Sequence, residues 1–421
     1  MLSFKRTKRV SSTPKQNHPD TKRIEVKLPA ENLEVGMYVT RLDRPWTEVP
    51  VLFQGLTISS SDDIELLRAH CQHVYIEIDR EFWLDTHSTG EFAEDETSYP
   101  GFRETQGFKG SLAEASIIFD DGRDHVNELI ERIKKEQQID IDQSRAVIRS
   151  CVHNILGNAN ALLWMSKIKD KDHYTAEHCL RVAILAIAFG RFIGLESAEL
   201  ELLGMCGMLH DVGKLRVPTD ILNKPGRLTR IEFAIMKQHT SHGRDILSEY
   251  EDLEPMVKDT AHFHHERIDG KGYPEGIDGG YLHKYIRMIT IVDAYDAITS
   301  ARSYKSASPA LDALQILFAE RGQHFDKEMV EAFIQMIGIY PPGSLVEMSN
   351  GEVGIVVSSN PEYRLRPRVE LVLDASKKLR KPYIINLADS VLDGQGEVYS
   401  IKSGLANGTY GVDVKDYITG K

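Results

Sequence analysis

LLGMCGMLHDVGK, residues 202–214, joins an apolar run ending at Leu209 directly to His210 and Asp211. The apolar run indicates a helix buried in a core. Placing a carboxylate at the end of such a run is costly unless something compensates for its charge, and a metal ion is the simplest compensation. Gly213 then turns the chain and sets the amine of Lys214 close to the pair. The stretch therefore predicts a metal site at the end of a core helix.

Further histidines and carboxylates of this kind stand along the chain. His264 and His265 are adjacent, and neighbours on a helix point about 100° apart, so both face one site only if the ions lie between their directions. Asp293 stands within an apolar stretch, MITIVDAYDAI, where a carboxylate needs a cation partner. The whole set is His178, His210, Asp211, His239, His264, His265 and Asp293. Such a set exceeds what one tetrahedral ion uses, whereas two ions sharing Asp211 would occupy all of it.

A polar turn follows the doubled histidine directly. Residues 264–274 read HHERIDGKGYP, with two glycines and a proline after the histidines. Glycine lets a backbone approach a ligand closely, and Tyr273 offers a ring for stacking or a hydroxyl for a phosphate. We interpret the ligand set and this turn as a hydrolase of phosphate esters. An ordinary surface turn is the alternative that composition alone leaves open.

Composition limits the classes of protein to consider. With 421 residues, two or three domains are expected. The formal charge of −12 argues against broad binding of nucleic-acid polymers, which requires a basic face, but allows a small anionic ligand. No apolar run reaches the roughly 20 residues that span a bilayer, and the start MLSFKRTKRVSS lacks the apolar stretch of a signal peptide. We therefore expect a soluble cytoplasmic protein.

The cysteines are widely spaced and form no Cys-x-x-Cys pair. Their neighbours are apolar or helical, so we expect buried free thiols in a reducing compartment. The four are Cys71, Cys151, Cys179 and Cys206.

The pattern in the first part of the chain changes several times. Residues 1–23 are rich in Lys, Arg, Ser and Thr, which predicts a disordered basic tail. Residues 24–85 alternate with period two around a short capped helix, which predicts a small α+β domain. Polar residues at 86–112 indicate a linker, and helical periodicity at 113–165 indicates connecting helices.

The rest of the chain divides at a proline pair. Residues 166–340 read as consecutive helices, one of which opens with a capping box at Thr229 and is expected to deliver His239. Residues 341–421 alternate around Asn350-Gly351, a hairpin signal, and predict a β-rich appendage. The predicted fold class is mainly α, with a helical catalytic domain flanked by the two smaller units.

These motifs resemble those of HD-GYP domain proteins, the branch of the HD metal-dependent phosphohydrolases associated with cyclic di-GMP hydrolysis in bacteria. The resemblance runs from about residue 160 to 340, a range that includes His239. The unit at 24–85 is similar to a small domain often fused ahead of HD-GYP modules, which implies no chemistry. The matching segments are DHYTAEH at 172–178, HDVGK at 210–214, the turn at 264–274, and residues 293–305.

The resemblance implies how the ligands divide between two ions. Some family members bind a third ion through a glutamate four residues before the first histidine, but this chain has Tyr174 there, so two ions are expected. Fe or Mn is expected, with Zn, Co or Ni as alternatives. One ion would take His178, His210, Asp211 and Asp293, and the second would take His239, His264 and His265, with Asp211 bridging.

Other residues receive predicted roles around these ligands. Asp211 and Lys214 are the candidate catalytic residues, and Asp269 and Asp296 are expected to orient ligand histidines. Ser303 stands where the family usually has proline, a departure that concerns loop geometry. The predicted substrate contacts are Gly272, Tyr273, Pro274, Arg302 and Lys305.

The predicted function is hydrolysis of cyclic di-GMP to linear pGpG, to GMP, or to both, in bacterial signalling. One alternative is a phosphohydrolase that prefers pGpG or another nucleotide. Another is a scaffold that binds cyclic di-GMP and signals through its terminal units, although no ligand is lost. Neither a nucleic-acid polymer nor a membrane is expected as a partner. A homodimer or a signalling partner held through the N-terminal part is a hypothesis drawn from the helical pattern at 113–137.

Overall fold

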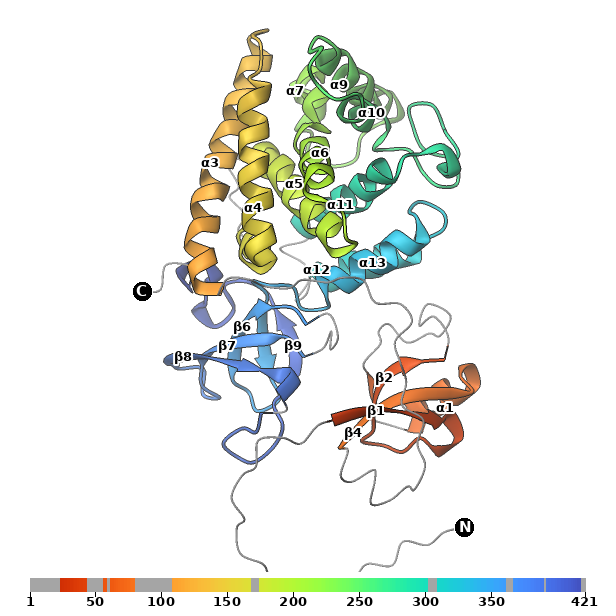
Figure 1. Ribbon diagram of the computed structural model, residues 1–421, viewed down its shortest axis with the longest axis vertical. Helices are drawn as coiled ribbons and strands as arrows, with labels where there is room; N and C mark the ends of the chain where they lie inside the picture. The colour runs from red at the N-terminus through yellow and green to blue at the C-terminus, as the bar shows by residue number, and fades with distance from the viewer. Residues whose placement is uncertain are drawn as a thin grey trace, which may run out of the picture. The chain divides into compact units, whose positions relative to one another are not determined.

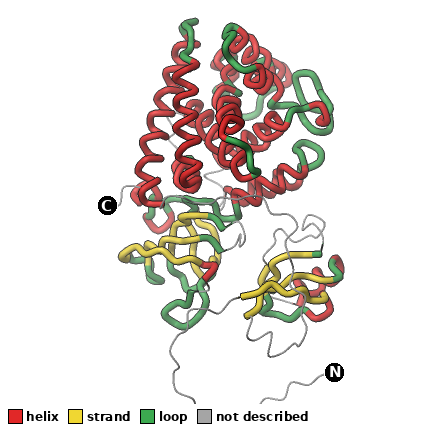
Figure 2. Tube along the Cα trace, viewed as in Figure 1, coloured by secondary structure: helices red, strands yellow, loops and turns green. Residues whose placement is uncertain are grey.

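The computed structural model describes residues 23–43, 56–58, 61–79, 108–167, 174–301, 309–360, 366–389 and 391–417. The chain splits into two compact units, Met1–Glu96 and Thr97–Lys421, and each is described by itself. The predicted mainly α class is confirmed (Figures 1 and 2). The predicted basic tail and almost all of the predicted linker lie outside the described residues, as do Arg302 and Lys305. No helix in the described ranges is long and apolar enough to cross a membrane.

The first unit is an antiparallel sheet with a helix. Period-two alternation places Val26 and Leu28 on the buried face, opposite Ile76 and Val74, and Leu67 of the helix is buried as well. The strand order is β1-β4-β2-β3. The elements are β1 (Arg23–Pro29), β2 (Tyr38–Leu42), β3 (Leu56–Thr57), α1 (Ser61–His70) and β4 (His73–Asp79). This is the α+β architecture that the sequence predicts.

The second unit is built around a helix that is buried on every side. Residues 176–190 of α5 are all buried, including the charged Glu177 and Arg181, and residues 182–190 are apolar all round. The long helices α3 and α4 run side by side next to it (Figure 1). The helices are α3 (Phe108–Lys134), α4 (Ile141–Met165), α5 (Tyr174–Phe192), α6 (Ser197–Leu209), α7 (Thr219–Leu222), α8 (Arg230–Lys237), α9 (His239–Ser248), α10 (Pro255–Phe263), α11 (Lys284–Ala301), α12 (Pro309–Ala319) and α13 (Lys327–Ile337).

A short 3-10 helix, η3 (Val212–Arg216), follows α6 and packs closely on α9. Gly213 makes this approach possible, because a Cβ there would lie 1.9 Å from the carbonyl oxygen of His239 and 2.3 Å from the backbone nitrogen of Gly243. Both distances are far inside van der Waals contact. The glycine after Asp211 therefore serves close packing, and it brings Asp211 next to the start of α9.

Helix α8 opens with the predicted capping box but ends earlier than expected. Thr229 Oγ1 accepts the Glu232 N–H, and the Glu232 carboxylate accepts the Thr229 N–H. The expectation that this helix continues to His239 is wrong. The N–H of Gln238 bonds to the carbonyls of Ile235 and Met236, which closes the last turn, and His239 begins α9.

A five-stranded antiparallel sheet ends the second unit, as predicted. Asn350-Gly351 forms the turn between β5 and β6, with Gly351 at φ +86°. Every residue of β6 is buried, since this central strand is covered on both faces. The strands are β5 (Leu345–Met348), β6 (Val353–Ser358), β7 (Arg368–Leu373), β8 (Leu379–Asn386) and β9 (Ile401–Leu405), in the order β8-β7-β6-β5-β9.

The four cysteines are buried and free, as predicted. Burial raises the pKa of the Cys151 thiol to about 12 and that of the Cys179 thiol to about 11. These thiols therefore stay protonated at neutral pH and behave as small apolar core groups.

Candidate metal centre

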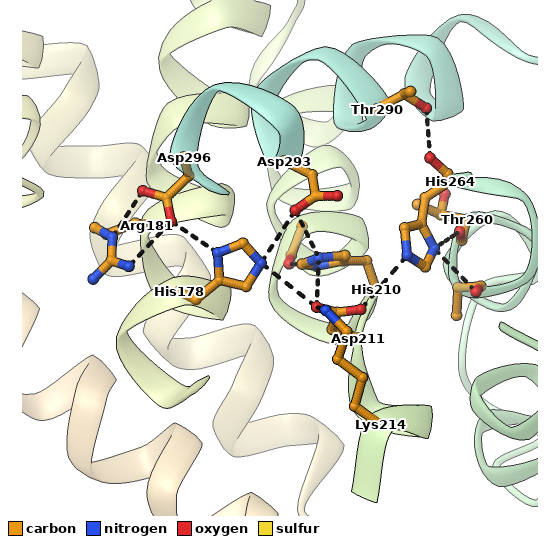
Figure 3. A network of polar contacts seen from close by, with 12 residues as sticks. His178, Arg181, His210, Asp211, Lys214, Thr260, His264, Thr290, Asp293 and Asp296 are labelled. Carbon is orange, nitrogen blue, oxygen red and sulfur yellow. Dashed lines mark hydrogen bonds and ion pairs between the residues drawn. The ribbon is translucent and has the colours of Figure 1, made fainter. Parts of the chain in front are cut away.

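The seven predicted ligands, which are far apart in sequence, converge inside the helical unit. Figure 3 shows His178, His210, Asp211, His264 and Asp293 of this set. They come from α5, the junction of α6 and η3, the start of α9, the end of α10, and α11. Asp211 belongs to two separate ligand groups, as the predicted bridging role requires. In each group the ligand atoms lie within 4.8 Å of one another, and the groups are Asp211, His239, His264 and His265; His178, His210 and Asp211; and His210, His264 and Asp293.

The two oxygens of Asp211 face different pairs of histidines. Oδ2 lies 3.5 Å from Nε2 of His178 and 3.3 Å from Nε2 of His210. Oδ1 lies 3.5 Å from Nε2 of both His239 and His264. Two atoms that bind the same ion at about 2.0–2.2 Å lie roughly 2.8–3.6 Å apart. The spacing therefore suits one ion on each side of the carboxylate.

Asp293 completes the side of the centre that holds His178. Its Oδ1 lies 3.2 Å from Nε2 of His178 and 3.8 Å from Nε2 of His210. Asp293 is on α11, and Thr290 of the same helix donates a hydrogen bond of 2.9 Å to the carbonyl of His264. That contact ties α11 to the end of α10, so the ligands of the two sides are held in one framework.

Helix ends orient three of the histidines. The last carbonyls of a helix lack intrahelical partners, and a histidine just beyond can donate to them. Because a carbonyl only accepts, Nδ1 must carry the proton, so the Nε2 lone pair of the neutral ring is free to bind a cation held beside Asp211. The Nδ1 donors and their carbonyl acceptors are His210 to Gly207 (2.8 Å), His239 to Met236 (2.7 Å) and His264 to Thr260 (3.1 Å).

Unpaired polar atoms in the centre fit a bound cation. Asp211 Oδ1 and His210 Nε2 are buried and have no hydrogen-bond partner. Leaving such a group unpaired costs about 1–3 kcal/mol. A divalent cation binds carboxylate oxygen and imidazole nitrogen, so it would satisfy both atoms at once.

Carboxylates dominate the electrostatics on the His178 side. Burial lowers the pKa of His178 and His210, but Asp211 and Asp293 raise it more, and the pKa of His210 reaches about 9. Burial raises the carboxyl pKa of Asp211 and Asp293, yet the facing cationic groups outweigh it and hold both well below the ordinary value. Both carboxylates are thus ionised at neutral pH, as metal binding requires.

On the side of Asp211 that holds His239 and His265, burial is the largest influence on the histidine pKa values. It lowers the pKa of His239 to about 4 and that of His265 well below the ordinary value. These rings are neutral at neutral pH, which is the form that binds a metal.

A buried arginine supports the predicted orienting role of Asp296. Nδ1 of His178 contacts Asp296 Oδ2 at 2.8 Å, and Arg181 donates to both oxygens of Asp296 at 2.8 and 3.0 Å (Figure 3). Arg181 is 1% exposed and also donates to Glu177. Arg181 is not among the residues predicted from the sequence, although a charged residue one turn after His178 in an apolar helix was a signal for it.

Replacing Asp296 with Asn should weaken metal binding at the centre by about 10- to 100-fold, because the substitution keeps the shape but removes the charge that orients His178. Competition with a chromogenic chelator measures the affinity. Asp245→Asn, an exposed position on α9, is the control. Equal metal affinity in Asp296→Asn and wild type would rule out the orienting role.

Lys214 lies where the sequence places it, one turn of η3 after Asp211. Its Nζ forms an ion pair with Asp211 Oδ2. Burial lowers the pKa of Lys214, but Asp211 and Asp293 raise it more, so the net shift is upward. The amine is therefore cationic and faces the ligands.

The glycine-rich turn packs against the centre. The ring of Tyr273 stacks on that of His265, with centroids 4.8 Å apart and planes at 26°. A Cβ on Gly272 would lie 2.4 Å from Cα of Glu266, so only glycine fits there. Pro274 follows Tyr273 through a cis peptide bond and is exposed.

Asp269 has a different role from the one predicted. Its carboxylate accepts two hydrogen bonds of 2.9 Å from Arg267 and one of 3.1 Å from the Lys271 N–H. Asp269 therefore shapes the turn and does not orient a ligand histidine. The prediction did not take into account Arg267, two residues earlier, which donates to both carboxylate oxygens of Asp269.

Glu266 is a second functional residue that was not predicted from the sequence. It is 1% exposed, and its carboxylate accepts the N–H groups of Glu275, Gly276 and Ile277 at 2.7, 2.9 and 3.1 Å. Its position directly after the histidine pair was the available signal. Glu266 fixes the return of the turn and so the position of Tyr273.

Glu266→Gln should loosen this turn, since one acceptor oxygen becomes a donor that faces a backbone N–H. A lost buried hydrogen bond costs about 1–3 kcal/mol, so amide exchange at 275–277 should accelerate by roughly tenfold or more. Hydrogen exchange read by mass spectrometry tests this, with exposed Glu251→Gln as the control. Unchanged exchange at 275–277 would show that the turn holds without this carboxylate.

Comparison with known protein families assigns a model to each part of the chain. An HD domain model matches residues 163–329, which contain all seven candidate ligands. A domain of unknown function matches residues 25–144. A KOW domain associated with the HD domain matches residues 345–391.

Several characterised relatives align with the chain. Cyclic di-GMP phosphodiesterase PA4108 of Pseudomonas aeruginosa is 31% identical over 368 residues, which cover 85% of this chain and 87% of the relative. The response regulator RpfG of Xanthomonas campestris, also named a cyclic di-GMP phosphodiesterase, is 36% identical over 40% of this chain and 45% of its own. A 3'3'-cGAMP-specific phosphodiesterase of Vibrio cholerae is 34% identical over 40% of this chain and 32% of its own.

Among solved structures, Bd1817, an HD-GYP-type protein of Bdellovibrio bacteriovorus, superimposes with a TM-score of 0.45 at 18% identity, over 73% of this chain and 98% of its own. The family assignment follows from the alignment with the Pseudomonas relative along most of both chains, and from the HD domain model over the segment that carries the ligands. This chain is a metal-dependent hydrolase and belongs to the HD-GYP family of HD-domain proteins.

Proposed function

We propose that this chain is a two-metal phosphodiesterase that hydrolyses cyclic di-GMP to pGpG, to GMP, or to both. The observation that carries the proposal is the carboxylate of Asp211, whose two oxygens each face a separate pair of histidines. The substrate is supported by the relative that aligns over 87% of its length and is named for cyclic di-GMP.

The ligands would divide around Asp211 as the contacts suggest. His178, His210 and Asp293 would hold one ion, and His239, His264 and His265 the other, with Asp211 shared. Fe or Mn is the proposed metal, and Zn, Co or Ni are alternatives that the same donors accept. Bound there, the two cations supply Lewis acidity toward a phosphoryl oxygen and lower the pKa of water toward neutrality.

The side chains around the ions bind and position the substrate. Asp211 sets the separation of the two ligand groups, and the cationic Lys214 beside it is placed to bind a phosphate oxygen. Tyr273, stacked on His265, limits where the nucleotide can lie. Arg302 and Lys305 stay proposed contacts for the phosphate or a guanine edge.

One experiment separates the proposed function from its two alternatives, a phosphohydrolase that prefers another nucleotide and a binding scaffold. Purified, metal-loaded protein is incubated with cyclic di-GMP, 3'3'-cGAMP or pGpG, and the products are separated by HPLC. We expect the highest kcat/KM for cyclic di-GMP. A higher value for cGAMP or pGpG would move the substrate assignment and leave the phosphodiesterase assignment standing. Binding of all three without turnover would favour a scaffold and overturn the enzyme proposal.

A further inference from the structure

Helix α8 presents an aromatic side chain that the core does not use. None of its residues is buried, and Phe233 is 47% exposed. The helix is nevertheless held in place by its capping box and by an ion pair of 2.7 Å between Lys224 and Glu232. Phe233 is therefore a fixed apolar surface beside the start of α9, where His239 stands.

Phe233 extends a row of rings that begins at the candidate metal ligands. The Tyr273 ring, stacked on His265, lies with its centroid 6.1 Å from that of Phe233, and their planes meet at 80°. The Tyr273 centroid is also 6.4 Å from that of His239. The turn after α10 and helix α8 thus meet in a continuous aromatic wall, from the ligands to the protein surface.

Lys237 adds a cation to this wall. It lies one helical turn after Phe233, on the same face of α8. Its Nζ is 5.5 Å from the centroid of Phe233 and 5.6 Å from that of Tyr273. Over the described part of the chain, no carboxylate forms an ion pair with Lys237, in contrast to Lys224 of the preceding loop. Its charge is available to a ligand that lies on the two rings.

We infer that Phe233, Lys237 and Tyr273 form a subsite that binds a guanine base of the substrate and selects guanine over adenine. The inference rests on the proposed function, because a base linked through ribose to a phosphate at the ligands would reach this wall. Rings of any base stack on aromatic side chains, so Phe233 and Tyr273 supply affinity. Guanine presents two acceptors, N7 and O6, along one edge, whereas adenine presents one acceptor and a donor. A lysine amine only donates, so Lys237 supplies the preference for guanine.

Binding to full-length, metal-loaded protein tests the subsite without turnover. The probes are the phosphorothioate analogues of cyclic di-GMP and cyclic di-AMP, measured by calorimetry. Phe233→Ala should weaken binding of both analogues by about tenfold. Phe233→Trp, which keeps an aromatic ring, should bind both analogues about as tightly as wild type. Lys237→Gln should weaken binding of the guanine analogue by about tenfold and leave the adenine analogue within about twofold. The metal content of every variant should equal that of wild type.

Ile231→Ala is the matched control. Ile231 is 76% exposed on the same helix, two residues before Phe233 and so on roughly the opposite face. Its replacement should leave binding unchanged. Equal binding by Phe233→Ala and wild type, or an equal loss for both analogues in Lys237→Gln, would overturn the inference.

Failure of the subsite and failure of the proposed function give different results. Wild type that hydrolyses cyclic di-GMP while Phe233→Ala binds normally refutes the subsite alone. Wild type that binds the guanine analogue through Phe233 but never consumes cyclic di-GMP refutes the enzyme proposal alone. Wild type that binds neither analogue refutes both.

Discussion

Replacing Asp211 with Asn should lower kcat/KM for cyclic di-GMP by about a thousandfold or more. The substitution removes the charge that both candidate ligand groups share, and each ion supplies several kcal/mol of transition-state stabilisation. Each factor of ten in rate corresponds to about 1.4 kcal/mol, so loss of about 4 kcal/mol gives three decades. The bound metal should fall below one ion per chain, as measured by elemental analysis of the purified variant.

Asp220→Asn is the control for this experiment, since Asp220 is exposed on α7, close to Asp211 in sequence. It should keep wild-type activity and metal content. Circular dichroism should show the same helix content in both variants, because Asp211 lies at the end of α6 and not within it. Wild-type activity in Asp211→Asn would rule out a catalytic centre built on this carboxylate.

Removing the metal with a chelator should abolish activity to a similar degree, and adding Mn²⁺ or Fe²⁺ should restore it. The physical reason lies in the ligands: among the described residues, Asp211 Oδ1 and His210 Nε2 are buried without hydrogen-bond partners, and a divalent cation binds atoms of both kinds. Activity should rise with added metal until two ions are bound per chain. The measurement is a titration that follows hydrolysis and metal content together.

The same titration should raise the thermal midpoint of unfolding. A ligand that binds only the folded state stabilises it by about 4 kcal/mol when its concentration exceeds the dissociation constant a thousandfold. Full activity at one ion per chain would contradict the two-ion assignment. Full activity in chelator-treated protein with no measurable metal would contradict any role for the ions.

The parts of the site that could be predicted from sequence are those carried by local patterns. His210-Asp211 stands out because the residues before it are apolar, and the Asn350-Gly351 turn because hairpins need such residues. The capping box at Thr229 was also local, and the structure has both of its hydrogen bonds. Convergence of the ligands followed from their chemistry, since each alone was costly to bury.

The remaining features depend on contacts between residues far apart in the chain. Arg181 lies 115 positions from Asp296, and nothing local shows that the two meet. The close approach of η3 to α9 at Gly213 also joins residues that are far apart in the chain. Glu266 was not predicted because its three partners belong to the returning arm of the turn, whose path the sequence does not state.

Anomalous diffraction from crystals of the metal-loaded protein tests the two-ion centre most directly. We expect two peaks, one on each side of Asp211, with each carboxylate oxygen about 2.0–2.2 Å from its own ion. The first peak should lie among His178, His210 and Asp293, and the second among His239, His264 and His265. A single peak, or two peaks that Asp211 does not join, would contradict this account.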